Sequence, residues 1–287
     1  MKAIVIEQTE TKPAYHNATL KDVPRPESLE EDQALLEVSA VSFNHRELWI
    51  RKGQYPGIIF GSILGADGIF TEYYAARQED IFKAPDHLTD AEAAALPLAG
   101  LTAYRAVFTK GQVAQGQNVL ITGIGGGVAL MALAFCVAAG ANVYVTSSDE
   151  GKIAKAVRLG ARGGVNYKEA GGELFDVVID GAGGDGVKTF TQILRLGGII
   201  VSYGMTVKPK VDFTMAAVLR NIEIRGSTMG SRLEFEQMLD YVSKHKLRPV
   251  VSQVWRGLES AEEAFEVMKK GSQFGKLVLS LKSASKL

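Results

Sequence analysis

One segment limits the possible folds more than any other: residues 118–146, NVLITGIGGGVALMALAFCVAAGANVYVT. A short apolar run leads into a glycine-rich turn, a long apolar stretch follows, and a second short apolar run closes the segment. This is the pattern of a buried strand, a tight turn, a buried helix and a parallel strand, which together make one βαβ unit. A chain with this unit near its centre is expected to build an α/β fold with a parallel sheet.

The turn inside this segment predicts an anion site. Glycine adopts backbone conformations that other residues avoid, so the cluster at 123–127 lets the chain turn tightly and approach a ligand closely. The helix that follows offers free N–H groups and partial positive charge at its start. The cluster could serve only the turn, but between a strand and a helix we interpret it as the diphosphate site of a dinucleotide.

The end of the second strand indicates which dinucleotide is bound. Sheets that select NAD place Asp or Glu there to bond the ribose hydroxyl, whereas NVYVT runs into Ser147 and Ser148. These hydroxyls and the ammonium of Lys152 can donate to a 2′-phosphate, so we expect NADPH. The alternative is that Ser148 only caps the next helix and that Lys152 is solvated.

Strands and helices alternate around the βαβ unit, and the strands suit the doubly wound order 3-2-1-4-5-6. The six expected strands are NVLIT, NVYVT, GVNY, DVVID, IIVSYG and IEIRG. A helix is expected over VKTFTQILRL (187–196). The third and fourth strands are joined by only eight residues, KEAGGELF, which predicts a stretched crossing without a full helix.

Helix starts are marked by three Ser/Thr-x-x-Glu capping boxes, at residues 89–92, 231–234 and 260–263. Pro97 is expected to break or kink the helical segment that follows the first box. Before this point the chain reads as short strands, KAIVIE, ALLEVSAVSF and IFTEYYAA, separated by prolines. Such strands predict a small barrel or sandwich, to which the closing strand KLVLSL is expected to return.

Composition excludes several classes of partner. Lys plus Arg and Asp plus Glu both number 32, so no net field favours nucleic acid or an anionic membrane surface. The chain has no apolar run long enough to span a bilayer and no secretory leader, which indicates a cytoplasmic protein. The single cysteine, Cys136, and four scattered histidines leave no disulfide framework and no visible metal site.

Several local patterns resemble the medium-chain dehydrogenase/reductases, and in particular their zinc-free, zeta-crystallin-like NADPH:quinone oxidoreductase branch. The patterns are VSFNHRELWIRKGQYP, LPLAGLTAYRA, GIGGGVA, GGVNYK, DVVIDGAGG, LRLGGIIVSYG and the terminal GKLVL. The resemblance covers nearly the whole chain. It implies a Rossmann-type doubly wound parallel sheet at residues 93–251, plus a GroES-like, β-barrel-type catalytic domain from residues 1–92 and 252–287.

The resemblance also implies a set of site residues. Asn44 and Thr102 would lie near the nicotinamide, Tyr167 would cover the 2′-phosphate, and Asn44 and Tyr55 are the candidate catalytic groups. Trp49 and Tyr55 fall on the family's pocket aromatics, although both could simply pack the barrel. The implied cofactor contacts are Asn44, Thr102, Gly123, Gly125, Gly126, Gly127, Val128, Ser147, Ser148, Lys152, Tyr167, Gly204 and Lys276.

Zinc-dependent members of the superfamily place a cysteine where Asn44 stands and a histidine in the turn that reads GADG here. Neither ligand is present, so a zinc alcohol dehydrogenase is the least favoured interpretation. Asp67, in this turn, is either a polar residue lining the pocket or a turn residue, and we favour the turn residue.

The chain also departs from the family in length, at Gly68–Ile69 and in KEAGGELF. Either the protein is truly shortened at both places, or residues are missing from the sequence.

The expected function is an NADPH-dependent reductase that transfers hydride to a small apolar quinone or α,β-unsaturated carbonyl compound. A rival from another class is a non-catalytic, NADPH-binding regulatory or structural protein whose shortened barrel closes no substrate pocket. The family often dimerises through the edge strands of its Rossmann sheets, so the resemblance implies a homodimer with IEIRG at the interface.

Overall fold

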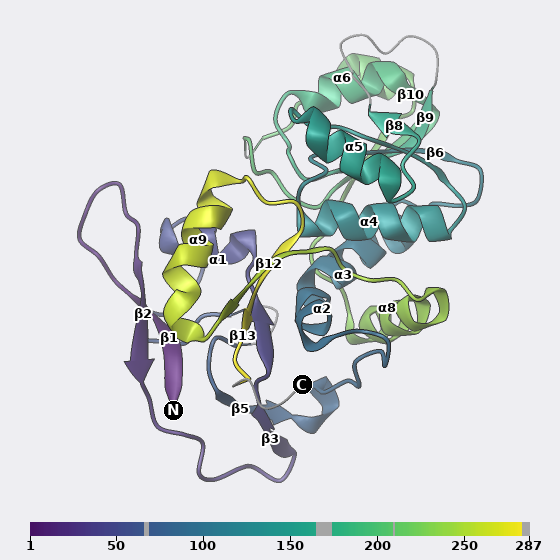
Figure 1. The fold of residues 1–287 in the computed structure, drawn as a ribbon. Helices are drawn as coiled ribbons and strands as arrows, with labels where there is room; N and C mark the ends of the chain where they lie inside the picture. Colours follow the sequence, from purple (N-terminus) through teal and green to yellow (C-terminus); the bar gives the residue numbers. More distant parts are fainter. Residues whose placement is uncertain (66–68, 165–173, 209, 283–287) are drawn as a thin grey trace. The chain divides into compact units, whose positions relative to one another are not determined.

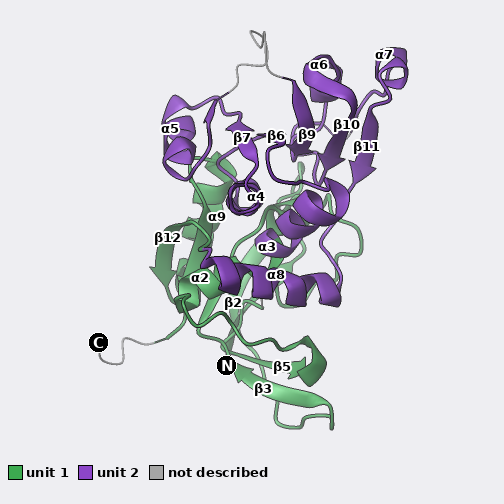
Figure 2. Cartoon of the chain, turned by 90° about the vertical axis from the view of Figure 1, so that its right-hand side faces the viewer, with its two compact units in different colours: residues 1–98, 248–287 green, residues 99–247 purple. Residues whose placement is uncertain are grey.

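The computed structural model describes residues 1–65, 69–164, 174–208 and 210–282 (Figure 1). The chain divides into two compact units (Figure 2). Unit 1 contains residues 1–98 and 248–287, and unit 2 contains residues 99–247. The domain boundaries drawn from the sequence stay a prediction.

Unit 2 is built on a six-stranded parallel sheet of order β8-β7-β6-β9-β10-β11. Numbered along the chain, these strands follow the order 3-2-1-4-5-6, so the predicted doubly wound Rossmann-type sheet is confirmed. The strands are β6 (Asn118–Ile121), β7 (Asn142–Val145), β8 (Gly163–Gly164), β9 (Phe175–Asp180), β10 (Leu194–Ser202) and β11 (Glu223–Gly226). The predicted stretched crossing between the third and fourth strands falls mainly on residues 165–173, which lie outside the described residues.

The helices of unit 2 follow the sequence pattern with one correction. The helix expected over residues 187–196 ends at Ile193, because Leu194 already pairs with Phe175 of the neighbouring strand. The register then shifts before Ile199. The helices are α3 (Pro97–Tyr104, whose first two residues belong to unit 1), the π-helical turn η2 (Arg105–Lys110), α4 (Gly127–Ala138), α5 (Glu150–Arg158), α6 (Gly186–Ile193), α7 (Met215–Leu219) and α8 (Arg232–His245).

Helix α4 is apolar around its whole circumference, and that explains its position. A helix without a polar face has to be buried, and α4 contacts β6, β7 and η2. An apolar cluster lies around β9, β10, α6 and α7. Its buried members are Leu120, Phe175, Val178, Val187, Phe190, Ile193, Leu194, Ile200, Ala217 and Ile222.

Unit 1 holds small separate sheets. Strand β1 (Lys2–Glu7) pairs with β2 (Asn17–Asp22), and β3 (Gln33–Glu37) pairs with β5 (Tyr73–Arg77), both antiparallel. Strand β13 (Lys276–Ser280) lies between β12 (Val251–Arg256) and β4 (Ala40–Ser42), so the closing strand joins the N-terminal region as predicted. The run ALLEVSAVSF is not one strand, because it divides into β3 and β4.

Unit 1 has an apolar core in which Phe43, Phe70 and Phe265 pack ring to ring. The elements α1 (His45–Arg51), η3 (Leu258–Ser260) and α9 (Ala261–Lys270) contribute residues to this core. Two further helical elements of unit 1 are η1 (Gln78–Asp80) and α2 (Asp90–Ala95).

Two of the three predicted capping boxes are confirmed. Thr89 caps α2 together with Glu92, and Ser231 caps α8 together with Glu234. The third prediction is wrong, because the Ser260 hydroxyl donates to the carbonyl of Arg256 and makes no cap bond. The predicted break at Pro97 is confirmed, since α2 ends at Ala95 and Pro97 is the first residue of α3.

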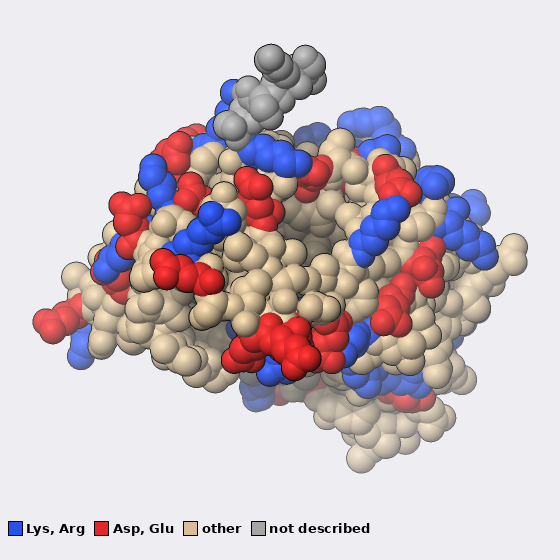
Figure 3. All heavy atoms as spheres, turned by 90° about the horizontal axis from the view of Figure 1, so that it is seen from below, with Lys and Arg blue, Asp and Glu red and all other residues tan. Residues whose placement is uncertain are grey.

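The surface carries both signs of charge. On the face seen in Figure 3, basic and acidic side chains are interspersed and no continuous basic patch forms. Among the described residues, no helix has the length and apolar character needed to cross a membrane.

Candidate functional site

The glycine loop lies at the carboxyl end of β6, where parallel sheets bind ligands. Gly123 has a φ of +64°, a conformation that favours glycine. The loop is fixed to the next strand, because Gly123 N–H donates to Thr146 Oγ1 over 3.3 Å and Ile124 N–H donates to the Thr146 carbonyl over 3.0 Å. Ile124 is buried beneath the loop, whereas Gly126 is exposed.

Helix α4 begins directly after Gly126, which is its N-cap. The first N–H groups of a helix have no intrahelical acceptor, so the amides from Gly127 onward remain available to a ligand. Gly126 has no side chain, and a Cβ added to it would lie 3.8 Å from its nearest neighbour, the Gly123 carbonyl oxygen. The loop therefore presents bare backbone and the positive end of a twelve-residue helix to solvent.

A buried hydrogen-bond network supports the loop from below. Thr122 Oγ1 donates to Asp180 Oδ1 over 2.7 Å and accepts from the Gly181 amide over 3.2 Å. Asp180, which is 1% exposed, also accepts from the amides of Ala182 and Gly183. This network ties the ends of β6 and β9 together.

Sequence reasoning did not identify the roles of Thr122 and Asp180. The available signal was a polar residue at the end of each of two apolar strands, NVLIT and DVVID.

The structure after the end of β7 contradicts one interpretation of the sequence. Asp149, and not Ser148, is the N-cap of α5, and its Oδ1 accepts from the amides of Gly151 over 2.8 Å and Lys152 over 3.3 Å. The alternative in which Ser148 caps this helix is therefore wrong. Ser147 Oγ accepts from the Asp149 amide over 3.1 Å, and Ser148 is exposed.

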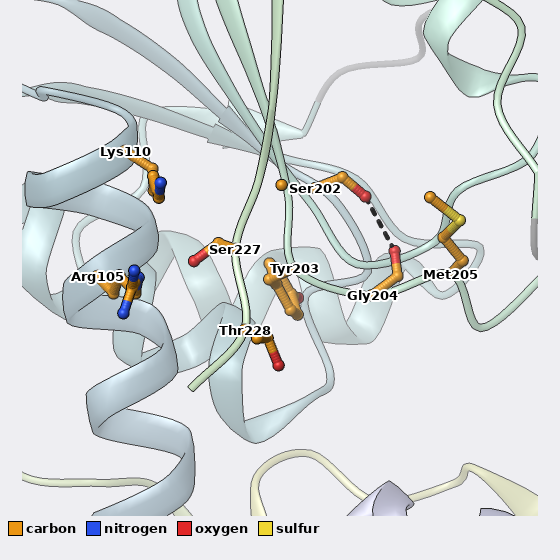
Figure 4. A pocket seen from close by; sticks show the side chains of 9 residues that line it. Arg105, Lys110, Ser202, Tyr203, Gly204, Met205, Ser227 and Thr228 are labelled. Atoms are coloured by element: carbon orange, nitrogen blue, oxygen red, sulfur yellow. Dashed lines mark hydrogen bonds between the residues drawn. The ribbon is translucent and has the colours of Figure 1, made fainter. Parts of the chain in front are cut away.

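A pocket of about 430 Å³ opens at the carboxyl ends of β10 and β11 (Figure 4). Gly204, a predicted cofactor contact, lines it with Tyr203. Burial and the nearby carboxylate of Asp180 raise the pKa of the Tyr203 phenol. Thr102, another predicted contact, is buried in α3 with its hydroxyl 3.9 Å from Met229 Sδ.

Unit 1 brings two predicted contacts together. Lys276 Nζ donates to Asn44 Oδ1 over 2.5 Å and to the Phe43 carbonyl over 2.7 Å. Lys276 is 5% exposed and Asn44 is 6% exposed. The backbone N–H of Asn44 donates to Glu47 Oε2 over 2.7 Å at the start of α1.

The candidate aromatic residues of unit 1 have cationic neighbours. The guanidinium of Arg46 lies 4.9 Å from the ring centre of Tyr55, which is 37% exposed. The ammonium of Lys52 lies 5.0 Å from the ring centre of Trp49. Tyr167 and Asp67 lie outside the described residues. The functional assignments of all the candidate residues stay predictions.

The donor groups around Asn44 do not fit a zinc ion. The amide oxygen that would replace the cysteine thiolate of zinc enzymes faces the ammonium of Lys276, a cation that disfavours a second one. Over the described residues, His, Cys, Asp and Glu form no cluster of three or more that could hold a metal.

Comparison with known proteins identifies the family. A protein of Leptosphaeria maculans described as a zinc-type alcohol dehydrogenase-like protein is 35% identical to this chain, over 94% of this chain and 95% of its own length. The chain belongs to the medium-chain dehydrogenase/reductase superfamily. It is an oxidoreductase of this superfamily, and residues 127–244 match the family described as zinc-binding dehydrogenase.

Solved structures agree with this membership. An NAD-dependent alcohol dehydrogenase superposes with a TM-score of 0.86 and 26% identity, covering 98% of this chain and 100% of its own. The quinone oxidoreductase of Thermus thermophilus, known also in complex with NADPH, gives a TM-score of 0.83 and 27% identity with the same coverage. These neighbours carry a Rossmann-type sheet with a GroES-like catalytic domain, which confirms the predicted fold class.

The alignment with the Leptosphaeria protein also bears on length. It spans 344 positions, more than the 287 residues of this chain. That relative therefore has internal residues with no counterpart here. The two predicted places of shortening are Gly68–Ile69 and residues 168–175, and Gly68 and residues 168–173 lie outside the described residues.

Proposed function

We propose that this protein is an NADPH-dependent reductase of quinones or α,β-unsaturated carbonyl compounds that works without zinc. The observation that carries the proposal is the exposed glycine loop at the start of α4, with hydroxyls and an ammonium following β7. The NADPH complex of the Thermus quinone oxidoreductase supports the same choice.

The chain's own groups would hold the coenzyme in two regions of unit 2. The amides at the start of α4 would bind the diphosphate, since Gly126 leaves them uncovered. Ser147, Ser148 and Lys152 would bind the 2′-phosphate. The Asp149 carboxylate is directed to its own helix, where it accepts two amide hydrogen bonds.

When bound, the nicotinamide ring would supply a hydride to an electrophilic carbon of the substrate. The protein would contribute positioning and a polar environment for the substrate oxygen. Asn44 suits this role, because Lys276 occupies its amide oxygen and fixes which side of the side chain carries the N–H donors. Tyr55 is the second candidate, since its phenol is a proton donor on an exposed side chain.

The proposed zinc independence rests on the contact between Asn44 and Lys276 in unit 1. An amide oxygen bonded to a buried ammonium takes the place of a thiolate ligand. Polarisation of the substrate oxygen would then come from hydrogen-bond donors and not from a Lewis acid.

A second candidate function is NADPH binding without catalysis. It is favoured by the length difference from the Leptosphaeria relative, because missing internal residues could leave the substrate side incomplete. Stoichiometric NADPH binding without turnover of any quinone, enone or aldehyde would support this candidate.

We also propose a homodimer formed through β11. This strand is at the edge of the sheet, and the neighbouring α7 exposes Met215 and Leu219, which are 69% and 75% accessible. An uncovered edge with apolar neighbours favours strand addition by a second copy. A monomer in light scattering would contradict this assembly.

The test of the proposed function is NADPH oxidation by the purified full chain with 1,4-quinones, enones and aldehydes, and with NADH as the control. We expect turnover of quinones or enones, with NADPH preferred over NADH. Turnover of alcohols that depends on tightly bound stoichiometric zinc would contradict the proposal.

A further inference from the structure

Arg46, in α1 of unit 1, is a half-buried arginine whose guanidinium has no hydrogen-bond acceptor among the described residues. Its Nε is enclosed by protein atoms and is one of the few buried polar atoms without a partner in the described part of the chain. A guanidinium carries five N–H donors, and folded proteins usually satisfy such groups when they are covered. Arg46 therefore has donors that remain available to a ligand.

Arg51, in the same helix, shows the contrasting case of a fully paired guanidinium. Its Nη1 and Nη2 donate to the two carboxylate oxygens of Glu262 over 2.7 and 3.0 Å, and its Nε donates to the His16 carbonyl over 2.9 Å. Glu262 belongs to α9, the helix next to α1 in Figure 1. No described carboxylate takes this place at Arg46, so its planar fork could receive one from a bound molecule.

Arg46 lies close to both candidate catalytic groups of unit 1. It follows Asn44 by two residues, and its guanidinium carbon lies 4.9 Å from the ring centre of Tyr55. A cation is attracted to the face of an aromatic ring, so this contact limits the positions that the guanidinium can take. Tyr55 thus holds the cation in place without supplying a hydrogen-bond acceptor.

The surface of α1 around Arg46 is positively charged. Lys52, at the end of the helix, forms no ion pair with a described carboxylate, and its ammonium lies over the ring of Trp49. Removal of water from around the imidazole lowers the pKa of His45, and the charges of Lys52 and Lys276 lower it further, so His45 is mainly neutral at pH 7. A positive surface of this kind favours an anionic ligand.

We propose that Arg46 is a specificity-determining residue that selects α,β-unsaturated carbonyl substrates bearing a carboxylate. The inference rests on the proposed function and names the substrate class of that site. The two carboxylate oxygens would accept hydrogen bonds from the guanidinium, because its planar fork matches their spacing. Tyr55, which is 37% exposed, would contact the apolar body of the substrate.

The carboxylate itself takes no part in the reaction. A hydride with its two electrons passes from NADPH to the alkene carbon β to the ketone, and the C=C π bond breaks as the ketone becomes an enolate. A proton from solvent at the α carbon then gives the saturated ketone and leaves NADP⁺. Arg46 stays charged at neutral pH and transfers no proton, so its contribution is to bind and orient the substrate.

The test compares NADPH-dependent reduction of trans-3-benzoylacrylate and of its methyl ester by the full chain at constant ionic strength. The two compounds share the enone and the phenyl ring, and only the acid is charged. Because the ester activates the alkene more strongly, each substrate is compared between proteins. Arg46→Gln should lower kcat/KM for the acid about ten- to hundredfold, the effect of losing a charge-assisted pair, and change the ester by less than about twofold. Arg46→Lys should recover part of the loss.

Two variants serve as controls. Arg25 also lies over a tyrosine ring in unit 1, at 3.9 Å from the ring centre of Tyr73, so Arg25→Gln removes a matched cation and should leave both substrates unchanged. Lys52→Gln removes a neighbouring charge without removing the fork and should affect the acid less than Arg46→Gln does. The affinity for NADPH should be the same in Arg46→Gln as in the unmodified protein.

Several results would overturn the proposal. They are equal losses for acid and ester in Arg46→Gln, a loss for the acid that is as large in the Lys52 or Arg25 variant, or a parallel loss of NADPH affinity, which would make Arg46 a coenzyme contact. Turnover of the ester and of neutral quinones without these effects would refute the role of Arg46 and leave the proposed function standing.

An absence of any turnover would refute the proposed function instead, and binding then tests Arg46 by itself. Calorimetric titration with the saturated product, 3-benzoylpropanoate, in the presence of NADP⁺ requires no reaction. We expect saturable binding that Arg46→Gln weakens about tenfold or more. No saturable binding, or equal binding by both proteins, would overturn the assignment.

Discussion

The ammonium of Lys276 donates a hydrogen bond to the side-chain oxygen of Asn44, and both residues are almost completely buried. The same ammonium also donates to the Phe43 carbonyl, which precedes α1. Strand β13 thereby fixes the orientation of the Asn44 side-chain amide next to the start of α1. If Asn44 acts on the substrate as proposed, this geometry would make Lys276 a positioning residue for Asn44, beside the cofactor contact that the family resemblance implies.

The two roles of Lys276 predict different kinetics. If Lys276 positions Asn44, Lys276→Met should lower kcat more than it weakens NADPH binding, and combining it with Asn44→Ala should add little further loss. Lys276→Arg should retain part of the activity, because it keeps a donor. Steady-state kinetics and coenzyme titration of the three variants and the double variant test this. A large loss of NADPH affinity with an unchanged kcat would favour direct contact with the coenzyme.

Coenzyme choice is tested at the start of α5. Lys152→Ala should weaken NADPH about tenfold or more and leave NADH nearly unchanged, because only NADPH carries the phosphate that the ammonium would bind. Lys155→Ala removes the same charge from an exposed position on the same helix and is the control. Fluorescence titration of the unmodified protein and both variants with each coenzyme measures the affinities. Equal losses for NADPH and NADH in the Lys152 variant would remove its role in selection.

The sheet was predictable from the sequence because its signals are local. Strand and helix periods, the glycine cluster and two capping boxes each lie within a few consecutive residues, and they identify the strands and most helices. The strand order then follows from the doubly wound fold that this alternation indicates. The Ser260 prediction failed because the preceding turn, η3, lets the hydroxyl reach Arg256 instead. A capping pattern does not specify the conformation of the residues before it.

Contacts between distant residues were beyond sequence reasoning. Nothing near Lys276 in the sequence indicates that its ammonium is buried against Asn44, because that contact depends on β13 pairing with β4. The predicted strand order places β6 beside β9, but it does not specify that the Thr122 hydroxyl reaches the Asp180 carboxylate there. Pattern and spacing name the residue types at a site, whereas the tertiary pairing of strands decides which of them meet.

A charged substitution in the glycine loop should change the stability of the protein and its affinity for coenzyme in opposite directions. Gly126 has an ordinary φ of −82° and room for a Cβ, so Gly126→Asp should fold. Asp is a good N-cap residue and its charge is favourable at a helix start, so the free energy of unfolding should rise by about 0.3–1 kcal/mol. The same charge would repel a diphosphate and should weaken NADPH and NADH by at least about tenfold.

Urea unfolding and coenzyme titration of the Gly126→Asp variant measure the two effects, with Gly126→Ala as the uncharged control. Unaltered binding of both coenzymes by the Asp variant would show that the diphosphate lies elsewhere.

Glu234 is expected to contribute to the stability of the protein in a pH-dependent way. Burial is the largest single effect and raises the pKa of its carboxyl. The hydrogen bonds from the Ser231 amide and from the Thr109 and Ser231 hydroxyls, together with the nearby charge of Arg105, outweigh burial, so the pKa is lowered overall. A carboxyl whose pKa is lower in the folded state stabilises the protein above its unfolded pKa of about 4.3. That contribution disappears as the pH falls through the folded pKa.

Glu234→Gln should therefore lower the free energy of unfolding at pH 7 by about 1–3 kcal/mol, because it replaces the charged acceptor of these bonds. The difference from the unmodified protein should shrink as the pH falls below about 4.3. Glu236→Gln changes an exposed carboxylate on the same helix and should have little effect at either pH. Urea unfolding across this pH range measures all three proteins. A loss of equal size at both ends of the range would mean that Glu234 stabilises α8 by packing and not by its charge.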